Sequence, residues 1–178
     1  MKDILSELSK VNRPGMNELI KFLVSSDYFS APASRGYHLN VVGGLAKHHW
    51  NVFKELCDIK HSICQSADND SIRICALLHD ICKVNFFKVE RGGDPLLFGS
   101  IKITIDDQEP LGHGEKSVIV LQRYIKLTTD EALAIRWHMG AWDAVGDTSR
   151  RCLNQALDRC ALLRGLMLAD QMATFKEK

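Results

Sequence analysis

A short apolar run that encloses two polar residues is the strongest constraint on the fold. The run is Ile74–Cys82, and it contains the pair His79 and Asp80. Residues 71–83 are apolar on nearly all sides, which predicts a central buried helix. A carboxylate is costly to bury unless a cation meets it. The adjacent imidazole and carboxylate therefore indicate a divalent metal ion as their partner.

The composition is that of an ordinary globular domain. A chain of 178 residues can bury about two-thirds of its unfolded surface, so we expect one domain over residues 1–178. Hydrophobic residues make up 46% and charged residues 25% of the chain, which is typical of soluble globules. The net charge of +1, from 23 basic and 22 acidic residues, offers no global field for nucleic acid or an anionic membrane.

Membrane insertion and export are not expected. No apolar run approaches the ~20 residues that a membrane helix needs. Acidic and polar residues occupy the N-terminus where a signal peptide would have its apolar core, so we expect a cytoplasmic protein without membrane contact. The six cysteines form no C-x-x-C pair, and we expect them to be reduced and mostly buried.

The hydrophobic periodicity predicts a mainly α architecture. Helices are expected after Arg13-Pro14-Gly15 and over residues 43–59, 71–83, 112–125, 130–138 and 149–174. Turn residues and weak periodicity make residues 26–43 an ordered loop. Alternating residues on both sides of Gly92-Gly93-Asp94 predict a small β-hairpin insertion around residues 86–107.

Two further polar residues continue apolar helix faces. His48 lies on a stripe with Leu45 and Val52, and Asp170 extends a stripe that includes Met167. A single inward histidine is more often a hydrogen-bonded core residue, and a single inward aspartate is more often a cap or an ion pair. Three such sites on three helices favour a shared metal site instead. Imidazoles and carboxylates suit Mn, Fe, Co, Ni, Zn or Mg in differing degree.

These segments together resemble the HD-domain superfamily of metal-dependent phosphohydrolases. The matching stretches are Gly43–His48, Leu77–Lys83 and Leu168–Asp170, in the order H…HD…D. The resemblance covers about residues 30–172 and implies a single-domain HD-type helical bundle, mainly α, with the metal between central helices. The metal ligands that it implies are His48, His79, Asp80 and Asp170. His49 is interpreted as a neighbour of a ligand, not a ligand.

Two more histidines match positions that hold a second ion in two-metal members of the family. His113 opens one predicted helix and His138 ends another, and Asp80 would bridge the two ions. The alternative is that both histidines contact substrate phosphate in a one-metal site. One or two ions per chain are therefore compatible with the sequence, and we favour one.

Other residues have weaker claims to catalysis or substrate binding. Asp80 is expected to hold the metal and orient a water molecule, and Lys83 to contact a phosphate oxygen, with a solvated helix-end lysine as the alternative. Cys82 stands where relatives commonly have glycine, and we expect it to pack as a small side chain. The candidates for substrate binding are Arg35, His38, Lys116 and Trp142.

The function that the resemblance implies is metal-dependent hydrolysis of a nucleotide or another small phosphoester, as a monoesterase or a diesterase. One alternative is a catalytically silent sensor that binds a metal and a nucleotide. Another is a nucleic-acid phosphodiesterase acting with a partner, because residues 31–38 are similar to a stretch in the HD domain of bacterial 3′–5′ exoribonucleases. No OB-fold domain precedes that stretch here, so nucleic acid is not favoured. The oligomeric state stays open.

Overall fold

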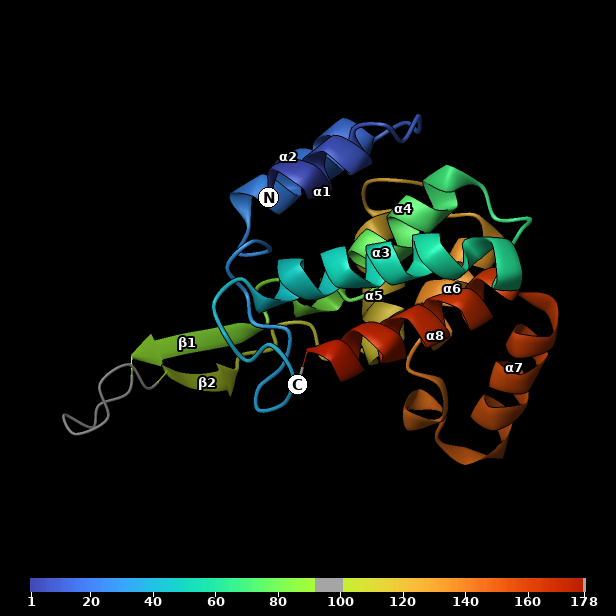
Figure 1. Cartoon of the computed structure of the whole chain (residues 1–178). Helices are drawn as coiled ribbons and strands as arrows, with labels where there is room; N and C mark the ends of the chain where they lie inside the picture. Colours follow the sequence, from blue (N-terminus) through green and yellow to red (C-terminus); the bar gives the residue numbers. More distant parts are fainter. Residues whose placement is uncertain (92–100, 178) are drawn as a thin grey trace.

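The computed structural model describes residues 1–91 and 101–177, and this part is mainly helical (Figure 1). Its α-helices are α1 (Lys2–Leu8), α2 (Met16–Ser25), α3 (Gly44–Ile63), α4 (Asn69–Leu78), α5 (His113–Gln122), α6 (Thr129–Trp137), α7 (Gly146–Arg159) and α8 (Ala161–Lys176). Two short 3-10 helices are also present, η1 (Ile81–Lys83) and η2 (Gly140–Asp143). The mainly α prediction is confirmed.

The central position of α4 follows from its composition. All side chains from Ile74 to Leu78 are completely buried, as the apolar run predicts. Helix α3 packs against both α4 and α8, and α3 and α8 run side by side in Figure 1. The expected helix over residues 71–83 is shorter in the structure. It ends at Leu78, and Asp80 leaves the helical region with φ −101° and ψ 22° before η1 begins.

The helix expected over residues 149–174 is two helices, and that prediction is wrong. Cys160 separates α7 from α8 with an extended backbone, φ −112° and ψ 97°. Its Sγ accepts a hydrogen bond from the amide of Leu163 and donates one to the carbonyl of Asp130. The apolar stripe continues unbroken across this turn, since Ala156, Cys160 and Leu163 are all buried. Periodicity therefore does not reveal the break.

The β-hairpin is present where the alternation predicts it. Strand β1 (Phe87–Arg91) pairs antiparallel with β2 (Ile101–Ile105), with Phe87 opposite Ile105. The expected turn at Gly92-Gly93-Asp94 lies outside the described residues. Helix α1 was not expected from the sequence, and it buries Ile4 and Leu8.

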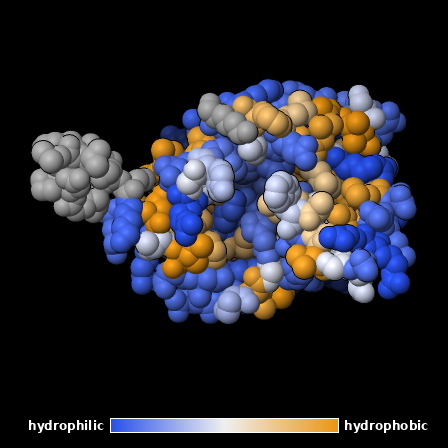
Figure 2. Space-filling model, turned by 90° about the horizontal axis from the view of Figure 1, so that it is seen from below, coloured by the Kyte–Doolittle hydropathy of each residue, from blue (hydrophilic) through white to orange (hydrophobic). Residues whose placement is uncertain are grey.

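The loop over residues 26–43 docks on the start of α3, as an ordered loop should. The amides of Gly43 and Leu45 donate to the carbonyls of Ser30 and Ala31, and Ala33 is completely buried. This loop and the end of α8 lie on the lower side of Figure 1. Seen from below, that side is hollowed, and mostly hydrophilic residues surround the hollow (Figure 2).

None of the helices in the described residues combines the length and the apolarity needed to cross a bilayer.

Candidate metal centre

The structure brings the six candidate ligands together from distant parts of the chain. They are His48 on α3, His79 and Asp80 after α4, His113 at the start of α5, His138 after α6, and Asp170 on α8. Their ligand atoms form two groups, each within 4.8 Å: His48 with His79 and Asp170, and Asp80 with His113 and His138. The packing of α3 against α4 and α8, and of α5 against α6, creates this arrangement.

Asp80 links the two groups through its two carboxylate oxygens. Oδ1 lies 2.6 Å from Nε2 of His113 and 3.2 Å from Nε2 of His138. Oδ2 lies 2.5 Å from Nζ of Lys83 and 3.8 Å from Nε2 of His79. Because Asp80 is only 3% exposed, these contacts take the place of solvent around its negative charge.

His79 and His138 are held in the same way by backbone carbonyls. Each is the C-cap of its helix, and each Nδ1 contacts the carbonyl three residues earlier, Ala76 at 3.2 Å and Ile135 at 2.7 Å. A carbonyl oxygen only accepts hydrogen bonds, so Nδ1 carries the proton. In each neutral imidazole, Nε2 then presents a lone pair.

The two Nε2 atoms meet different neighbours. Nε2 of His138 lies within hydrogen-bond distance of Oδ1 of Asp80, at 3.2 Å. Nε2 of His79 is buried without a hydrogen-bond partner among the described residues. Buried acceptors without donors are costly. A cation between these atoms removes that cost, so the donor set fits a divalent metal ion.

His48 and His113 are held at Nδ1 by side chains. Nδ1 of His48 lies 2.9 Å from Oε2 of Glu177, and its Nε2 lies 3.1 Å from Oδ1 of Asp170. Nδ1 of His113 lies 3.3 Å from Sγ of Cys82. A carboxylate on the far nitrogen of a histidine is the usual support of a metal-binding imidazole, since it orients the ring and increases its basicity.

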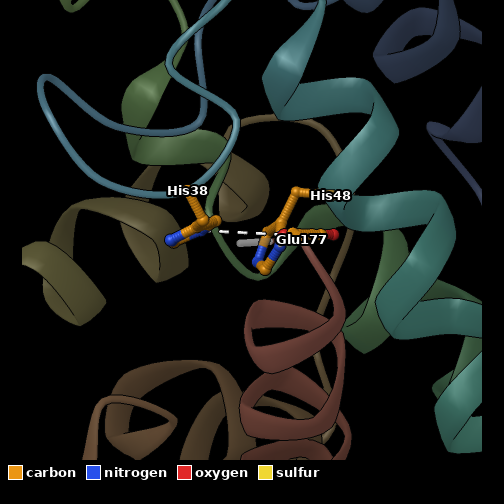
Figure 3. A group of neighbouring side chains, drawn as sticks. All are labelled: His38, His48 and Glu177. Atoms are coloured by element: carbon orange, nitrogen blue, oxygen red, sulfur yellow. Dashed lines mark hydrogen bonds and ion pairs between the residues drawn. The ribbon is translucent and has the colours of Figure 1, made fainter.

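The sequence reasoning missed Glu177. Its side chain is 2% exposed and also accepts a hydrogen bond from Nδ2 of Asn51 at 2.8 Å. Figure 3 shows the side chains of His38 and His48 together with Glu177 at the end of α8. A spacing of seven residues from Asp170 places Glu177 on the same helix face two turns later, and this signal could have identified it.

The electrostatics of the metal-free centre favour protons on two histidines. Burial opposes the charged form of His48, but Asp170 and Glu177 outweigh it and raise its pKa to about 9. Burial also opposes charge on His113, and Asp80 raises its pKa to about 10. At His79, burial dominates and lowers the pKa to about 3. A metal ion that bound through His48 would have to displace its proton, and a second ion bound through His113 would have to displace the proton there.

Asp80 itself stays ionised. Burial raises its pKa, but the charges of Lys83 and His113 outweigh burial and hold the pKa well below its ordinary value. A carboxylate that keeps its charge in a buried position is suited to holding a cation.

The weaker candidates lie at very different distances from this centre. Lys83 contacts Asp80, and Nε2 of His38 lies 4.0 Å from Oε2 of Glu177 (Figure 3). The ammonium group of Lys116 instead pairs with Asp107 and lies 5.2 Å from the ring centre of Phe86.

Arg35 and Trp142 are both exposed, Arg35 in the loop over residues 26–43 and Trp142 in η2, where it is 90% exposed. Cys82 is buried, as the packing interpretation requires, and it also contacts His113.

The comparison with protein families agrees with this geometry. A family model described as HD domain matches residues 39–174, a segment that contains all six candidate ligands. Arg35, His38 and Glu177 lie outside it. In the comparisons with curated proteins and with solved structures, no match was found. The chain therefore belongs to the HD superfamily of metal-dependent phosphohydrolases.

Proposed function

We propose that this protein is a metal-dependent phosphohydrolase that acts on a nucleotide or another small phosphoester. The observation that carries the proposal is the convergence of imidazole nitrogens on the buried carboxylate of Asp80. HD domains bind divalent metals, and the buried His and Asp groups around Asp80 could hold such an ion.

The residues that would hold the cation are His48, His79, Asp80 and Asp170. When bound, such an ion polarises a phosphoryl oxygen and lowers the pKa of a coordinated water. The neighbouring side chains supply the remaining chemistry.

The ammonium group of Lys83 lies 2.5 Å from Oδ2 of Asp80. Lys83 is then placed to offset negative charge that develops on a phosphate. His113 and His138 border the other oxygen of Asp80.

The number of ions stays a prediction. The grouping of Asp80 with His113 and His138 would suit a second ion, but the same side chains would suit contact with a substrate phosphate, and we favour one ion. If there are two ions, His113→Ala and His138→Ala should each lower metal content from about two per chain toward one. If there is one, metal content should not change, while KM rises and kcat changes less.

A panel of substrates tests the activity. Nucleoside monophosphates, cyclic nucleotides, dinucleotides and short RNA are each incubated with Mn, Co, Ni, Fe and Mg. We expect hydrolysis of at least one small phosphoester, abolished by Asp80→Asn. A matched control is Asp106→Asn, because Asp106 is a partly exposed carboxylate on the hairpin side, paired with Lys88.

Two outcomes of this panel contradict the proposal. Cleavage of RNA alone would favour the nucleic-acid phosphodiesterase. Tight nucleotide binding with no turnover under any metal would favour the sensor.

A further inference from the structure

We propose that His49 supplies a further nitrogen ligand to the metal centre, beside His79 and Asp80. This inference rests on the metal binding in the proposed function. The H…HD…D motif of the sequence does not include His49, so its role as a ligand is an addition to the motif.

The hydrogen bonds of Tyr28 determine which nitrogen of His49 is free. The hydroxyl of Tyr28 has one hydrogen, and it donates this hydrogen to the carbonyl of Leu77 at 2.7 Å. Nδ1 of His49 lies 2.8 Å from the same hydroxyl oxygen. Because the hydrogen of Tyr28 is already used, Nδ1 of His49 is the donor in this contact.

Nε2 of His49 therefore carries a lone pair and no hydrogen. It is buried and has no hydrogen-bond partner among the described residues, and the whole residue is 0% exposed. A doubly protonated ring would leave an N–H group without an acceptor in the same position, which is no less costly. The neutral form with a free lone pair on Nε2 is the one that fits.

That lone pair belongs to a side chain at the centre, not to one elsewhere in the core. Ligand atoms of His49, His79 and Asp80 lie within 4.8 Å of one another, and Nδ1 of His49 is occupied by Tyr28. The rings of His49 and His79 are 4.8 Å apart between centroids. His79 likewise has a buried Nε2 without a hydrogen-bond partner among the described residues. One metal ion could therefore accept the lone pairs of both histidines.

The support of His49 matches that of the other histidines. Nδ1 of each candidate ligand histidine contacts one neighbour: Glu177 for His48, Ala76 for His79, Cys82 for His113 and Ile135 for His138. Nδ1 of His49 contacts Tyr28 in the same way. Buried polar atoms of a core residue normally have a hydrogen-bond partner. Nε2 of His49 has no protein donor among the described residues.

A third imidazole next to His48 and His79 changes which ion the centre prefers. Imidazole nitrogen suits Fe, Co, Ni and Zn, whereas Mg prefers oxygen ligands. We therefore infer that the centre selects a transition metal ion over Mg.

Titration of metal-free protein with Co²⁺, followed by calorimetry and by visible absorption, tests the role of His49. We expect His49→Phe and His49→Gln to weaken Co²⁺ binding by about tenfold or more and to alter the absorption spectrum. Mg²⁺ binding should change much less. Tyr28→Phe, which keeps the ring and removes the acceptor of Nδ1, should weaken Co²⁺ binding in the same direction.

The matched control is Val52→Ala, a buried residue on the same helix. It should lower thermal stability without changing Co²⁺ affinity, so a loss seen only in the His49 variants is not a general effect of destabilisation. Wild-type Co²⁺ affinity and spectrum in both His49 variants would overturn the inference while leaving the proposed function intact. A wild-type protein that binds no metal would overturn both.

Discussion

Two buried carboxylates in this protein have opposite surroundings. Glu131, which is completely buried, receives hydrogen bonds from Arg13 at 2.6 and 2.9 Å, from Ser71 at 2.7 Å and from the amide of Thr128 at 2.8 Å. All of these partners are donors. Asp80, which is 3% exposed, meets Nε2 of His79 and of His138 as well as the donors Lys83 and His113.

The difference distinguishes a carboxylate whose partners are all donors from the one in the candidate metal centre. Other residues of the chain satisfy Glu131, so this carboxylate connects Arg13, in the segment between α1 and α2, to the start of α6 and contributes to stability. Among the described residues, the buried Nε2 atoms of His49 and His79 beside Asp80 have no hydrogen-bond partner. A metal ion, as we propose, would supply the positive charge that these atoms lack.

The largest expected effect on metal binding is that of Asp80→Ala. Wild-type protein grown with added transition metals should retain a divalent ion, and the variant should be nearly empty by elemental analysis. Because the ion binds the native state, saturating Co²⁺ should also stabilise the wild type, by about 2.7 kcal/mol at 100 times Kd, and should not stabilise the variant. Equal metal content in the two proteins would contradict the assignment of the centre.

The second prediction concerns the structural carboxylate. Glu131→Ala removes one partner of a buried ion pair and the acceptor of the capping box of α6, so we expect a loss of roughly 3–5 kcal/mol in the free energy of unfolding. Chemical denaturation measures this loss. Co²⁺ affinity of the folded variant should equal that of the wild type, and a large drop in affinity would mean that the two clusters are not independent.

A smaller effect is expected for the carboxylate behind His48. Glu177→Gln keeps the size of the side chain but replaces a charged acceptor by a neutral one, and should weaken metal binding about 10- to 100-fold. Calorimetric titration measures the affinity. Glu55→Gln is a matched control, since Glu55 pairs with Lys176 beside the same end of α8. If Glu55→Gln weakens binding equally, the effect comes from the packing of α8 and not from His48.

The smallest expected effect is on how the stability of the metal-free protein depends on pH. The sign of this dependence differs between the cluster around Glu131 and the histidines of the candidate metal centre. Burial raises the pKa of Glu131, but Arg13, Thr128 and Ser71 outweigh it and lower the pKa below its ordinary value of 4.5. The unfolded state therefore takes up the proton first as pH falls. This contribution to stability is complete above pH 4.5 and is lost as pH falls through the lower folded pKa.

The histidines act in the opposite direction. The pKa values of His48 and His113 are raised to about 9 and about 10, from 6.5. Their contribution to stability is complete below pH 6.5 and is lost as pH rises through 9 to 10. Denaturant unfolding in a chelator from pH 3 to 10 measures both arms. We expect His113→Ala to flatten the alkaline arm only and Glu131→Gln to flatten the acidic arm only.

Much of the fold could be predicted from local patterns. The buried α4 follows from an apolar run and the β-hairpin from alternating residues, because burial and strand pairing depend on periodicity along the chain. The turn at Cys160 could not be predicted this way, since the apolar stripe passes through it. What stabilises that turn is a contact with the carbonyl of Asp130 from another helix.

For the site, the sequence by itself determined the residue types and the family. His48, His79, Asp80 and Asp170 can be identified because inward polar residues interrupt apolar faces, and the HD match covers them all. Only the tertiary structure decided which nitrogen of each histidine faces the centre. It also decided that Glu177 supports His48, that Tyr28 supports His49, and that Lys116 pairs with Asp107. The physical reason is that hydrogen bonds between side chains depend on atoms a few ångströms apart in space, whereas the sequence records only their distance along the chain.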